Sequence, residues 1–336
     1  MSAENPPWSS ARCSRVDRLY AGMANRRRFF ADGWGDVDGL LGLGPQWARP
    51  DPPAPAEVQW VNERRQDGAL IRTGHFESSY GAPGFPDVCK RAYLEWILPR
   101  GAGPDTPICL HFAATGDEGF GRRRRAMALP LLRHGIASLL LENPYYGLRR
   151  PAGQRGKFLR SFADLWRMGS ATVEEGRALL GWLQAQGFTR LGVTGISMGG
   201  HMAAGTAALW HGPLATACCI TPHSAQVIFT EGILARQVAW EAMSGTPDPV
   251  ERVRGLLAVT DLCSLPPPRR PDAAVIVAGR RDAYIPAYSP VRLQRHWPGS
   301  VLHWLDSGHV TAFLFHRRTF VRAVREAFAA LTSGGR

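Results

Sequence analysis

The pentapeptide Gly195-Ile196-Ser197-Met198-Gly199 joins two segments of different hydrophobic pattern, and this junction constrains the fold more than any other feature of the sequence. Residues 190–194 (RLGVT) have the pattern of a buried strand, and residues 201–210 (HMAAGTAALW) that of a helix. A serine between two glycines at such a junction is typical of a sharp, strained turn, where a Cβ at either glycine would collide with the strand or the helix. The turn raises the Ser197 hydroxyl above the edge of a sheet, and the following helix directs its positive N-terminal end at the same place. The junction therefore predicts a nucleophilic serine.

Two more polar residues follow strand-like segments further along the chain. Residues 273–279 (AAVIVAG) predict a buried strand, and Asp282 comes shortly after it. Residues 301–305 (VLHWL) predict another strand, which is followed by His309. The carboxyl ends of parallel strands meet at one edge of a sheet, where open α/β sheets bind their ligands. The sequence therefore predicts that Ser197, Asp282 and His309 form a catalytic triad, against the alternatives of a turn-capping aspartate and a buried structural histidine.

The rest of the pattern agrees with an α/β-hydrolase fold. Three strands predicted at residues 58–62, 69–77 and 92–98 suit an antiparallel edge. Buried strands then alternate with amphipathic helices, and this alternation is typical of a parallel sheet with helices on both faces. We predict a mostly parallel sheet of the eight-stranded type, with further strands at residues 108–113, 137–141, 190–194, 215–220, 273–279 and 301–305, and with largely helical segments at 122–134, 158–186 and 197–210.

The alternation stops between residues 221 and 272. Residues 229–243 and 250–259 predict helices that each have one apolar face. An insert at this position is expected to fold over the serine as a helical cap, because its apolar side chains otherwise have too little surface to pack against. We therefore divide the chain into an N-terminal helix and Pro-rich linker (residues 1–56) and a hydrolase domain (57–331) with a cap insert (222–265), from which Phe229 is expected to contact substrate.

Other parts of the site can be assigned from their position at strand ends. The backbone N–H of Met198, directly after the serine, is one predicted donor to an oxyanion. The second is predicted to be Ala113, to within one residue, in the loop His111–Asp117 that follows a strand. His111 is interpreted as a residue that braces this loop, and Glu142 as a weaker alternative for the acid. Four residues are predicted to contact substrate, although the two tyrosines among them could instead pack in a tight turn: Ala114, Thr115, Tyr145 and Tyr146.

The N-terminal region carries a second amphipathic pattern. Residues 14–31 predict a helix with a stripe that is apolar apart from one arginine: Val16, Leu19, Tyr20, Met23, Arg27 and Phe30. Such a helix could pack on the hydrolase body or lie on a membrane surface. Residues 45–56 (PQWARPDPPAPA) are a Pro-rich linker.

Composition argues against several classes of function. The formal net charge is +12, but the basic residues are almost all arginine, with lysine only at positions 90 and 157, which indicates a compositional bias. The clusters at residues 26–28 and 122–125 match no nucleic-acid-binding motif, so we expect no nucleic-acid partner and interpret them as solvated helix faces or, alternatively, as a site for anions. The six cysteines lack metal-ligand spacing, so we expect no metal, no cofactor and inert buried thiols at Cys109, Cys218 and Cys219. The chain has no apolar run of transmembrane length, and residues 1–15 lack the apolar core of a secretory signal, so we expect a cytoplasmic protein, with peripheral membrane contact left open.

Two longer motifs resemble one known family. Residues 140–147 (LLENPYYG) and 193–202 (VTGISMGGHM) are similar to the α/β hydrolase domain-containing protein 18 family. The same holds for three shorter segments: Thr115–Asp117 with the arginines after it, Phe29–Trp34, and Gly279–Pro286. The resemblance is scattered over roughly residues 15–330. It implies an α/β-hydrolase fold with Ser197 as the nucleophile, and it implies little about the substrate.

Together these features predict a serine hydrolase that cleaves carboxylic esters through an acyl-enzyme on Ser197. An apolar cap favours a small-molecule or lipid ester with an acyl chain, and so a carboxylesterase or a lipid deacylase. Thioesterases, peptidases and acyltransferases use the same triad, so these reactions stay open. Two alternatives belong to other classes: an inactive scaffold, whose sign would be loss of a triad residue, and a module that binds anions or a membrane surface through its arginines.

Overall fold

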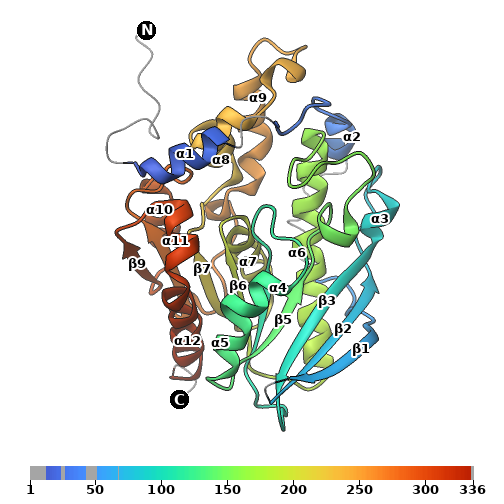
Figure 1. Ribbon diagram of the computed structural model, residues 1–336, viewed down its shortest axis with the longest axis vertical. Coiled ribbons are helices and arrows are strands. Elements are labelled where there is room, and N and C mark those ends of the chain that lie inside the picture. The colour runs from blue at the N-terminus through green and yellow to red at the C-terminus, as the bar shows by residue number, and fades with distance from the viewer. Residues whose placement is uncertain (1–12, 24–26, 43–50, 67, 334–336) are drawn as a thin grey trace.

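A nine-stranded sheet runs through the centre of the molecule (Figure 1). The computed structural model describes residues 13–23, 27–42, 51–66 and 68–333. The strands are ordered β1-β2-β3-β5-β4-β6-β7-β8-β9. The β1·β2, β2·β3 and β3·β5 pairs are antiparallel, and the remaining pairs are parallel. The strand bounds are β1 Gln59–Gln66, β2 Ala69–Glu77, β3 Arg91–Pro99, β4 Ile108–Phe112, β5 Ala137–Leu141, β6 Leu191–Ile196, β7 Ala215–Cys219, β8 Ala274–Gly279 and β9 Val301–Leu305.

Every segment predicted as a strand is a strand, and the predicted α/β-hydrolase fold is confirmed. The nine strands correspond to the nine predicted segments, and the sheet is thus one strand larger than the eight-stranded type. The outermost strand, β1, pairs only with β2 and has no buried residue. It therefore extends the antiparallel edge without adding to the core, and its charged side chains suit a solvated edge, as in the Glu63–Arg72 ion pair of 2.7 Å.

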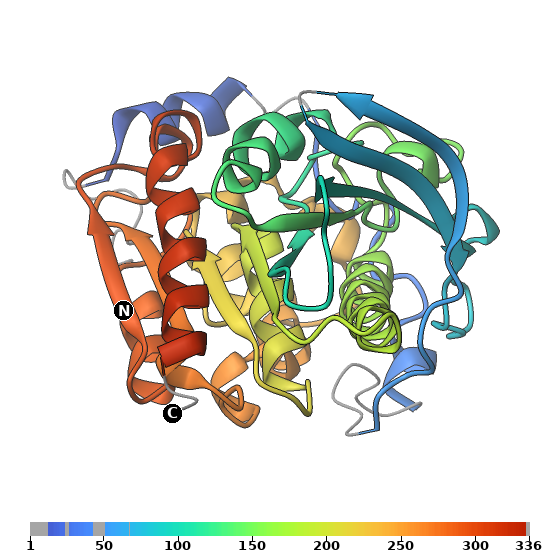
Figure 2. The same ribbon diagram turned by 90° about the horizontal axis from the view of Figure 1, so that it is seen from below.

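Helices cover both faces of the sheet, as the view from below shows (Figure 2). Apolar side chains of α6 (Phe162–Ala185), α7 (Met198–Ala208) and α10 (Tyr288–His296) pack on one face. The other face is covered by α12 (Arg317–Ser333) and by residues 121–132, where one helix was predicted over residues 122–134. This segment is α4 (Gly121–Arg123), a π-helical turn and α5 (Leu129–Leu132) in succession. Because both faces are covered, the strands β4, β5, β7 and β8 are buried at every residue and read as continuous apolar runs.

The cap insert departs from the prediction in its first half. Residues 229–243 do not form one helix: α8 (Ala225–Thr230) ends early, and two short 3₁₀ turns follow at Ile233–Gln237 and Trp240–Met243. The break lies at Gly232, where an added Cβ would collide with the carbonyl oxygen of Tyr284. The backbone at Gly232 therefore packs closely on the loop after β8, and the helix does not continue through this contact. The second predicted helix is present as α9 (Pro249–Leu257).

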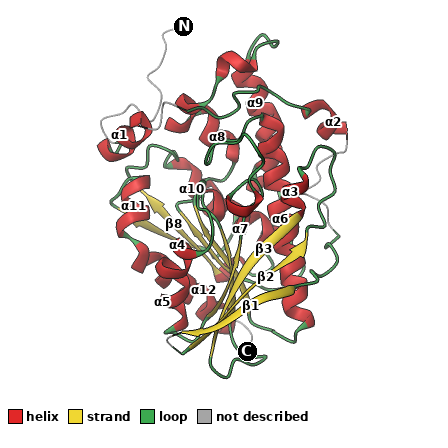
Figure 3. Cartoon of the chain, turned by 45° about the vertical axis from the view of Figure 1, so that its right-hand side comes forward, coloured by secondary structure: helices red, strands yellow, loops and turns green. Residues whose placement is uncertain are grey.

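The N-terminal helix is shorter than predicted, and its apolar stripe faces outward. It spans only α1 (Arg15–Met23), while residues 24–26 of the predicted helix lie outside the described residues. Its buried residues are Asp17 and Ala21, whereas the four residues of the predicted stripe that α1 contains are exposed: Val16 44%, Leu19 67%, Tyr20 50% and Met23 75%. The helix lies beside α11 (His309–Phe315) in two views of the molecule (Figures 1 and 3). Hydrogen bonds of the Asp17 carboxylate and of the Ser14 backbone N–H, both described below, hold the helix in this position.

The chain after α1 is joined to the cap insert. Phe29 forms backbone hydrogen bonds with Gln237 and Ala239, of 2.7 and 2.9 Å, so this part of the predicted helix is extended. The Phe29 and Phe30 rings are buried and both pack against Phe229. Two further short helices, α2 (Val37–Gly42) and α3 (Asp87–Lys90), lie at the surface. Residues 45–50 of the Pro-rich linker are outside the described part of the chain.

Two expectations from composition can be compared with the structure. Cys109, Cys218 and Cys219 are buried, as predicted, and burial raises the pKa of their thiols, that of Cys218 to about 12. Within the described ranges, none of the helices combines the length and the apolar composition that a bilayer span requires.

Candidate active site

The backbone at Ser197 is held in a strained conformation between β6 and α7. Ser197 has φ 56° and ψ −120°, a region that residues other than glycine rarely adopt. Its N–H donates to the Cys219 carbonyl on the neighbouring strand β7, at 2.9 Å. A Cβ at Gly195 would collide with the Gly199 backbone, and a Cβ at Gly199 with the Phe112 backbone at the end of β4. Both glycines of the predicted turn are therefore required by close contacts.

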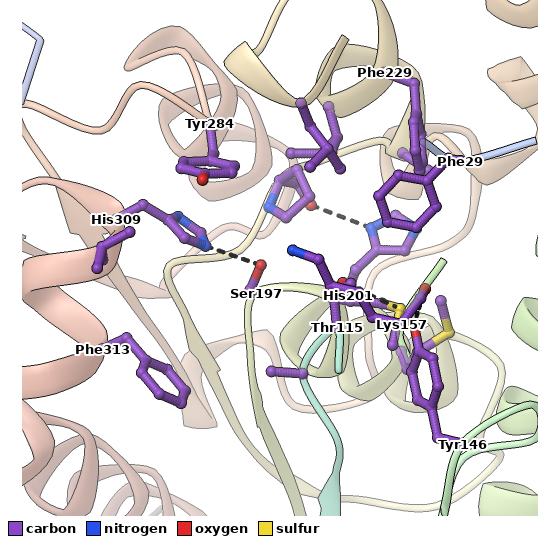
Figure 4. Close-up of a pocket in the computed structure, with 18 of the residues that line it drawn as sticks. Phe29, Thr115, Tyr146, Lys157, Ser197, His201, Phe229, Tyr284, His309 and Phe313 are labelled. Atoms are coloured by element: carbon purple, nitrogen blue, oxygen red, sulfur yellow. Dashed lines mark hydrogen bonds between the residues drawn. The ribbon is translucent and has the colours of Figure 1, made fainter. Parts of the chain in front are cut away.

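The structure brings Ser197, His309 and Asp282 together as one chain of hydrogen bonds. His309 Nε2 lies 3.0 Å from Ser197 Oγ (Figure 4), and His309 Nδ1 lies 2.7 Å from Asp282 Oδ2. Asp282 follows β8, and its other oxygen accepts the backbone N–H groups of Tyr284 and Ile285 at 2.8 and 2.9 Å. Both carboxylate oxygens of Asp282 are therefore engaged, which fixes the orientation of the carboxylate and, through it, that of the imidazole.

Charges around His309 favour its protonated form. Burial is the largest single influence and opposes protonation, but the charge and hydrogen bond of Asp282, together with the charge of Asp17, outweigh it and raise the pKa of His309. The ammonium group of Lys157 acts in the opposite direction. A base with a raised pKa accepts a proton from the serine hydroxyl more readily, provided that it is neutral at the start.

A cavity of about 570 Å³ lies beside the serine. Most of its wall is apolar and comes from three parts of the chain: α1 and Phe29, the hydrolase body, and the cap insert. The cap insert contributes Ala225, Ile228, Phe229 and Leu234. Figure 4 shows Phe29 and Phe229 on one side of Ser197, and His309 and Phe313 on the other. Such a cavity can hold an apolar group with its reacting carbonyl at Ser197.

Most of the other residues predicted for the site line this cavity. Met198, Ala114, Thr115, Tyr146 and Phe229 do so. Met198 begins α7, so its N–H is one of those at a helix start that have no intrahelical partner and can donate to a ligand. Ala113 is fully buried and does not line the cavity, although its backbone lies against Gly199.

Three of the singled-out side chains point elsewhere. Tyr145, predicted with Tyr146 to contact substrate, is buried away from the cavity, and its hydroxyl donates to Asp164 at 3.1 Å. His111 Nε2 lies 3.1 Å from Ser138 Oγ, and burial lowers the pKa of His111 to about 3, which suits a neutral bracing residue. Glu142 accepts the Gly119 N–H at 3.0 Å, so the carboxylate at His309 is that of Asp282.

Lys157 was not singled out from the sequence, yet it is a conspicuous polar group of the cavity. Its side chain points across the cavity toward Ser197 (Figure 4), and its Nζ lies 5.4 Å from the Phe158 ring centroid and 5.9 Å from that of Tyr20. Burial lowers the pKa of Lys157, and no carboxylate among the described residues lies within ion-pairing distance of it. The described cavity lining contains three further cations, Arg122, Arg125 and Arg317, and no acidic residue. The one feature of the sequence that could have pointed to Lys157 is the rarity of lysine in an arginine-rich chain.

Comparisons with known proteins give the family of the chain and proteins that share its fold. A sequence model described as alpha/beta hydrolase domain containing 18 matches residues 27–253 and 245–330. The structure is similar to that of an acetyl xylan esterase from Paenibacillus sp. R4, at 14% identity and a TM-score of 0.58, covering 90% of this chain and 98% of the other. It is also similar to acetyl xylan esterase 1 from Thermoanaerobacterium sp. JW/SL YS485 (15% identity, TM-score 0.56, covering 91% and 98%) and to an S-formylglutathione hydrolase from Agrobacterium tumefaciens (13%, 0.53, 81% and 99%). At such identities the likeness shows a shared fold.

The raised pKa of His309 predicts how the rate of reaction at Ser197 depends on pH. Only neutral imidazole can accept the Ser197 proton, so reaction at Ser197 should fall at acid pH as His309 becomes protonated. Because the pKa of His309 is raised, this fall should be centred above the ordinary value of 6.5. The rate of ester hydrolysis, or of labelling by a fluorophosphonate, measured across pH gives the midpoint. A rate that stays constant down to about pH 5 would be incompatible with His309 as the base.

Proposed function

The chain belongs to the alpha/beta hydrolase domain containing 18 family, and on that basis we propose that it is a serine hydrolase that cleaves carboxylic esters. The observation that carries this proposal is the hydrogen-bonded chain of Ser197, His309 and Asp282 on a strained strand-to-helix turn. This arrangement suits acyl transfer, because it places a base beside a hydroxyl and a carboxylate behind the base. The adjoining cavity leaves room for the substrate.

The proposed reaction has two halves. In the first, His309 Nε2 takes the Ser197 proton while Oγ attacks the ester carbonyl, and Asp282 stabilises the imidazolium that forms. The backbone N–H of Met198 and one from the loop at Ala113 and Ala114 are the proposed donors to the oxyanion. His309 then protonates the leaving alcohol, which departs and leaves an acyl group on Ser197. In the second half, His309 takes a proton from water and the hydroxide attacks the acyl carbon. The bond between the acyl carbon and Ser197 Oγ then breaks, His309 returns its proton to Oγ, and the carboxylic acid is released.

The apolar cavity wall supports an ester with an acyl chain, as expected of a carboxylesterase or a lipid deacylase. Thioesters and acyl acceptors other than water remain alternatives, because the same residues serve these reactions. Peripheral contact with a lipid surface is a compatible second property, favoured by exposed apolar side chains beside the cavity, among them Leu19, Met23 and Phe315. Flotation of the protein with anionic vesicles over a salt series would separate this property from catalysis in solution.

The proposed nucleophile can be tested by substitution. Ser197→Ala should lower kcat on p-nitrophenyl esters by about four to six orders of magnitude, because it removes the group that carries the acyl chain. The melting temperature should change little, since within the described residues the Ser197 hydroxyl bonds to no side chain other than His309. Ser333→Ala, at an exposed serine at the end of α12 that does not line the cavity, is the matched control. Undiminished turnover by Ser197→Ala would exclude the proposed reaction.

The cap insert is proposed to hold the acyl chain. Ile228 is better suited to a test than Phe229, because Ile228 lines the cavity while half-exposed, whereas Phe229 belongs to the buried cluster with Phe29 and Phe30. Ile228→Asp should lower kcat/KM for long-chain esters at least about tenfold more than for acetate esters, because a charge is placed where the chain would pack. Val88→Asp, on α3, is a control at a surface position. Equal losses on both esters would mean that the cap insert is only structural.

Lys157 is proposed to favour esters that carry an acidic group. A carboxylate or phosphate near the ester bond could pair with the ammonium, which lacks a protein partner of opposite charge in the described residues. Lys157→Met should lower kcat/KM for mono-p-nitrophenyl succinate by about tenfold or more relative to p-nitrophenyl butyrate. Lys90→Met is the natural control, because Lys90 is the other lysine of the chain and pairs with Asp87 at the surface. An equal effect of Lys157→Met on both esters would argue against recognition of an anion.

A further inference from the structure

Asp17 of α1 is a fully buried carboxylate that the proposed mechanism does not use. Its Oδ2 accepts the backbone N–H groups of Ala283 and His309, at 3.1 and 2.8 Å. Its Oδ1 accepts the N–H of Val310, at 2.9 Å. A single side chain from the N-terminal helix therefore contacts the backbone directly after Asp282 and the backbone of His309 itself.

These contacts join two segments that must keep a fixed separation. The loop after β8 carries Asp282, and the first residue of α11 is His309. Asp17 lies between them and bonds to both, so a shift of either segment would break a hydrogen bond to a buried carboxylate. Leaving such a group unsatisfied is costly, about 1–3 kcal/mol or more for a charged group. The carboxylate therefore resists changes in the distance between Asp282 and His309.

The residues around Asp17 also hold the start of α1 against the loop after β8 and against α11. Ser14 donates its backbone N–H to the Arg281 carbonyl at 2.8 Å, and Cys13 Sγ lies 3.9 Å from the Asp282 carbonyl oxygen. A Cβ at Gly308 would collide with the Ser14 side chain and come within 2.8 Å of Asp17 Oδ2, so glycine lets the helix approach. The start of α1 is thus fitted to the loop and to α11 over several residues.

Asp17 also contributes charge. The groups that face this region are Asp282, His309, Lys157 and Tyr284, whose ring centroid lies 4.8 Å from that of His309. Burial, the largest influence, raises the pKa of Asp17, while the three backbone N–H donors oppose this by stabilising the carboxylate. The charge of Asp17 in turn helps to raise the pKa of His309.

We propose that Asp17 is a positioning residue for the reaction at Ser197, which fixes the His309 imidazole against Asp282 and stabilises the imidazolium by its charge. This inference rests on the proposed function. Asp17 exchanges no proton: when the Ser197 proton moves to His309, the positive ring lies near two carboxylates, one bonded to its Nδ1 and one bonded to its backbone. Through Asp17, the N-terminal helix α1 therefore belongs to the proposed catalytic site.

The test is Asp17→Asn, which keeps the size of the side chain and removes its charge. We expect kcat to fall on the order of 10²-fold, because small displacements of a catalytic group have effects of this size. KM should stay within a factor of about two, since Asp17 does not line the cavity. The acid limb of the pH profile should move to lower pH, because a charge that raises the pKa of His309 has been removed.

Asp36→Asn is the matched control, since Asp36 directly precedes α2, outside the cap insert, accepts the Gly39 N–H at 3.1 Å and does not line the cavity. Asp17→Glu keeps the charge but changes the length of the side chain. It should therefore lower kcat, while the acid limb of the pH profile stays where it is in the unsubstituted protein. Circular dichroism and melting temperature show whether each variant is folded. An Asp17→Asn protein that is folded and has an unchanged kcat and acid limb would overturn the proposal.

Hydrogen exchange on the unsubstituted protein gives a test that needs no variant. The amides of Ala283, His309 and Val310 should exchange slowly, because each is bonded to a buried carboxylate. Rapid exchange at these amides would overturn the proposal. Failure of the proposed function has a different sign, namely activity that survives Ser197→Ala.

Discussion

The strained backbone at Ser197 is the constraint on which the other features of the site depend. A residue other than glycine with φ 56° costs roughly 1–3 kcal/mol and persists only where the surroundings hold it. Here β6 lies between two parallel neighbours, α7 packs on the sheet, and the Ser197 N–H bonds to Cys219 on β7. The same turn presents the Ser197 hydroxyl to His309 and the start of α7 to the cavity. A turn with an unstrained backbone at Ser197 would present neither the hydroxyl to His309 nor the start of α7 to the cavity.

Asp282 and His309, the proposed acid and base, are held by parts of the chain that are remote in sequence. Asp282 is fixed by the two amides that follow it, and His309 by Asp282. Asp17, more than 260 residues earlier, bonds to the backbone of both segments. The outer face of the same helix is apolar and exposed, and Tyr20 from it lines the cavity. A contact made on the outside of α1 would therefore act on the same helix whose inner face bonds to the backbone of His309.

Features that depend on local pattern could be predicted from the sequence. The glycines around Ser197 and the apolar runs of the central strands are fixed by close contacts and by burial on both faces, which leave a direct trace in residue type. The break of the cap helix at Gly232 depends on packing against Tyr284, which no local pattern reveals. Tyr145 and Tyr146 were equivalent in sequence, but the positive φ of Tyr145 (66°) turns the chain, and only Tyr146 reaches the cavity. Asp17 was not singled out from the sequence, because its hydrogen-bond partners are almost the whole chain away.

The central claim is that Ser197 carries the acyl group during turnover. Mass spectrometry of the unsubstituted protein tests it most directly, after acid quench within the first turnovers of p-nitrophenyl butyrate. The peptide that contains Ser197 should gain the mass of one butyryl group, and fragmentation should place that group on the serine oxygen. An acyl group found on another side chain, or steady hydrolysis during which no peptide gains mass under conditions that favour accumulation, would contradict the claim.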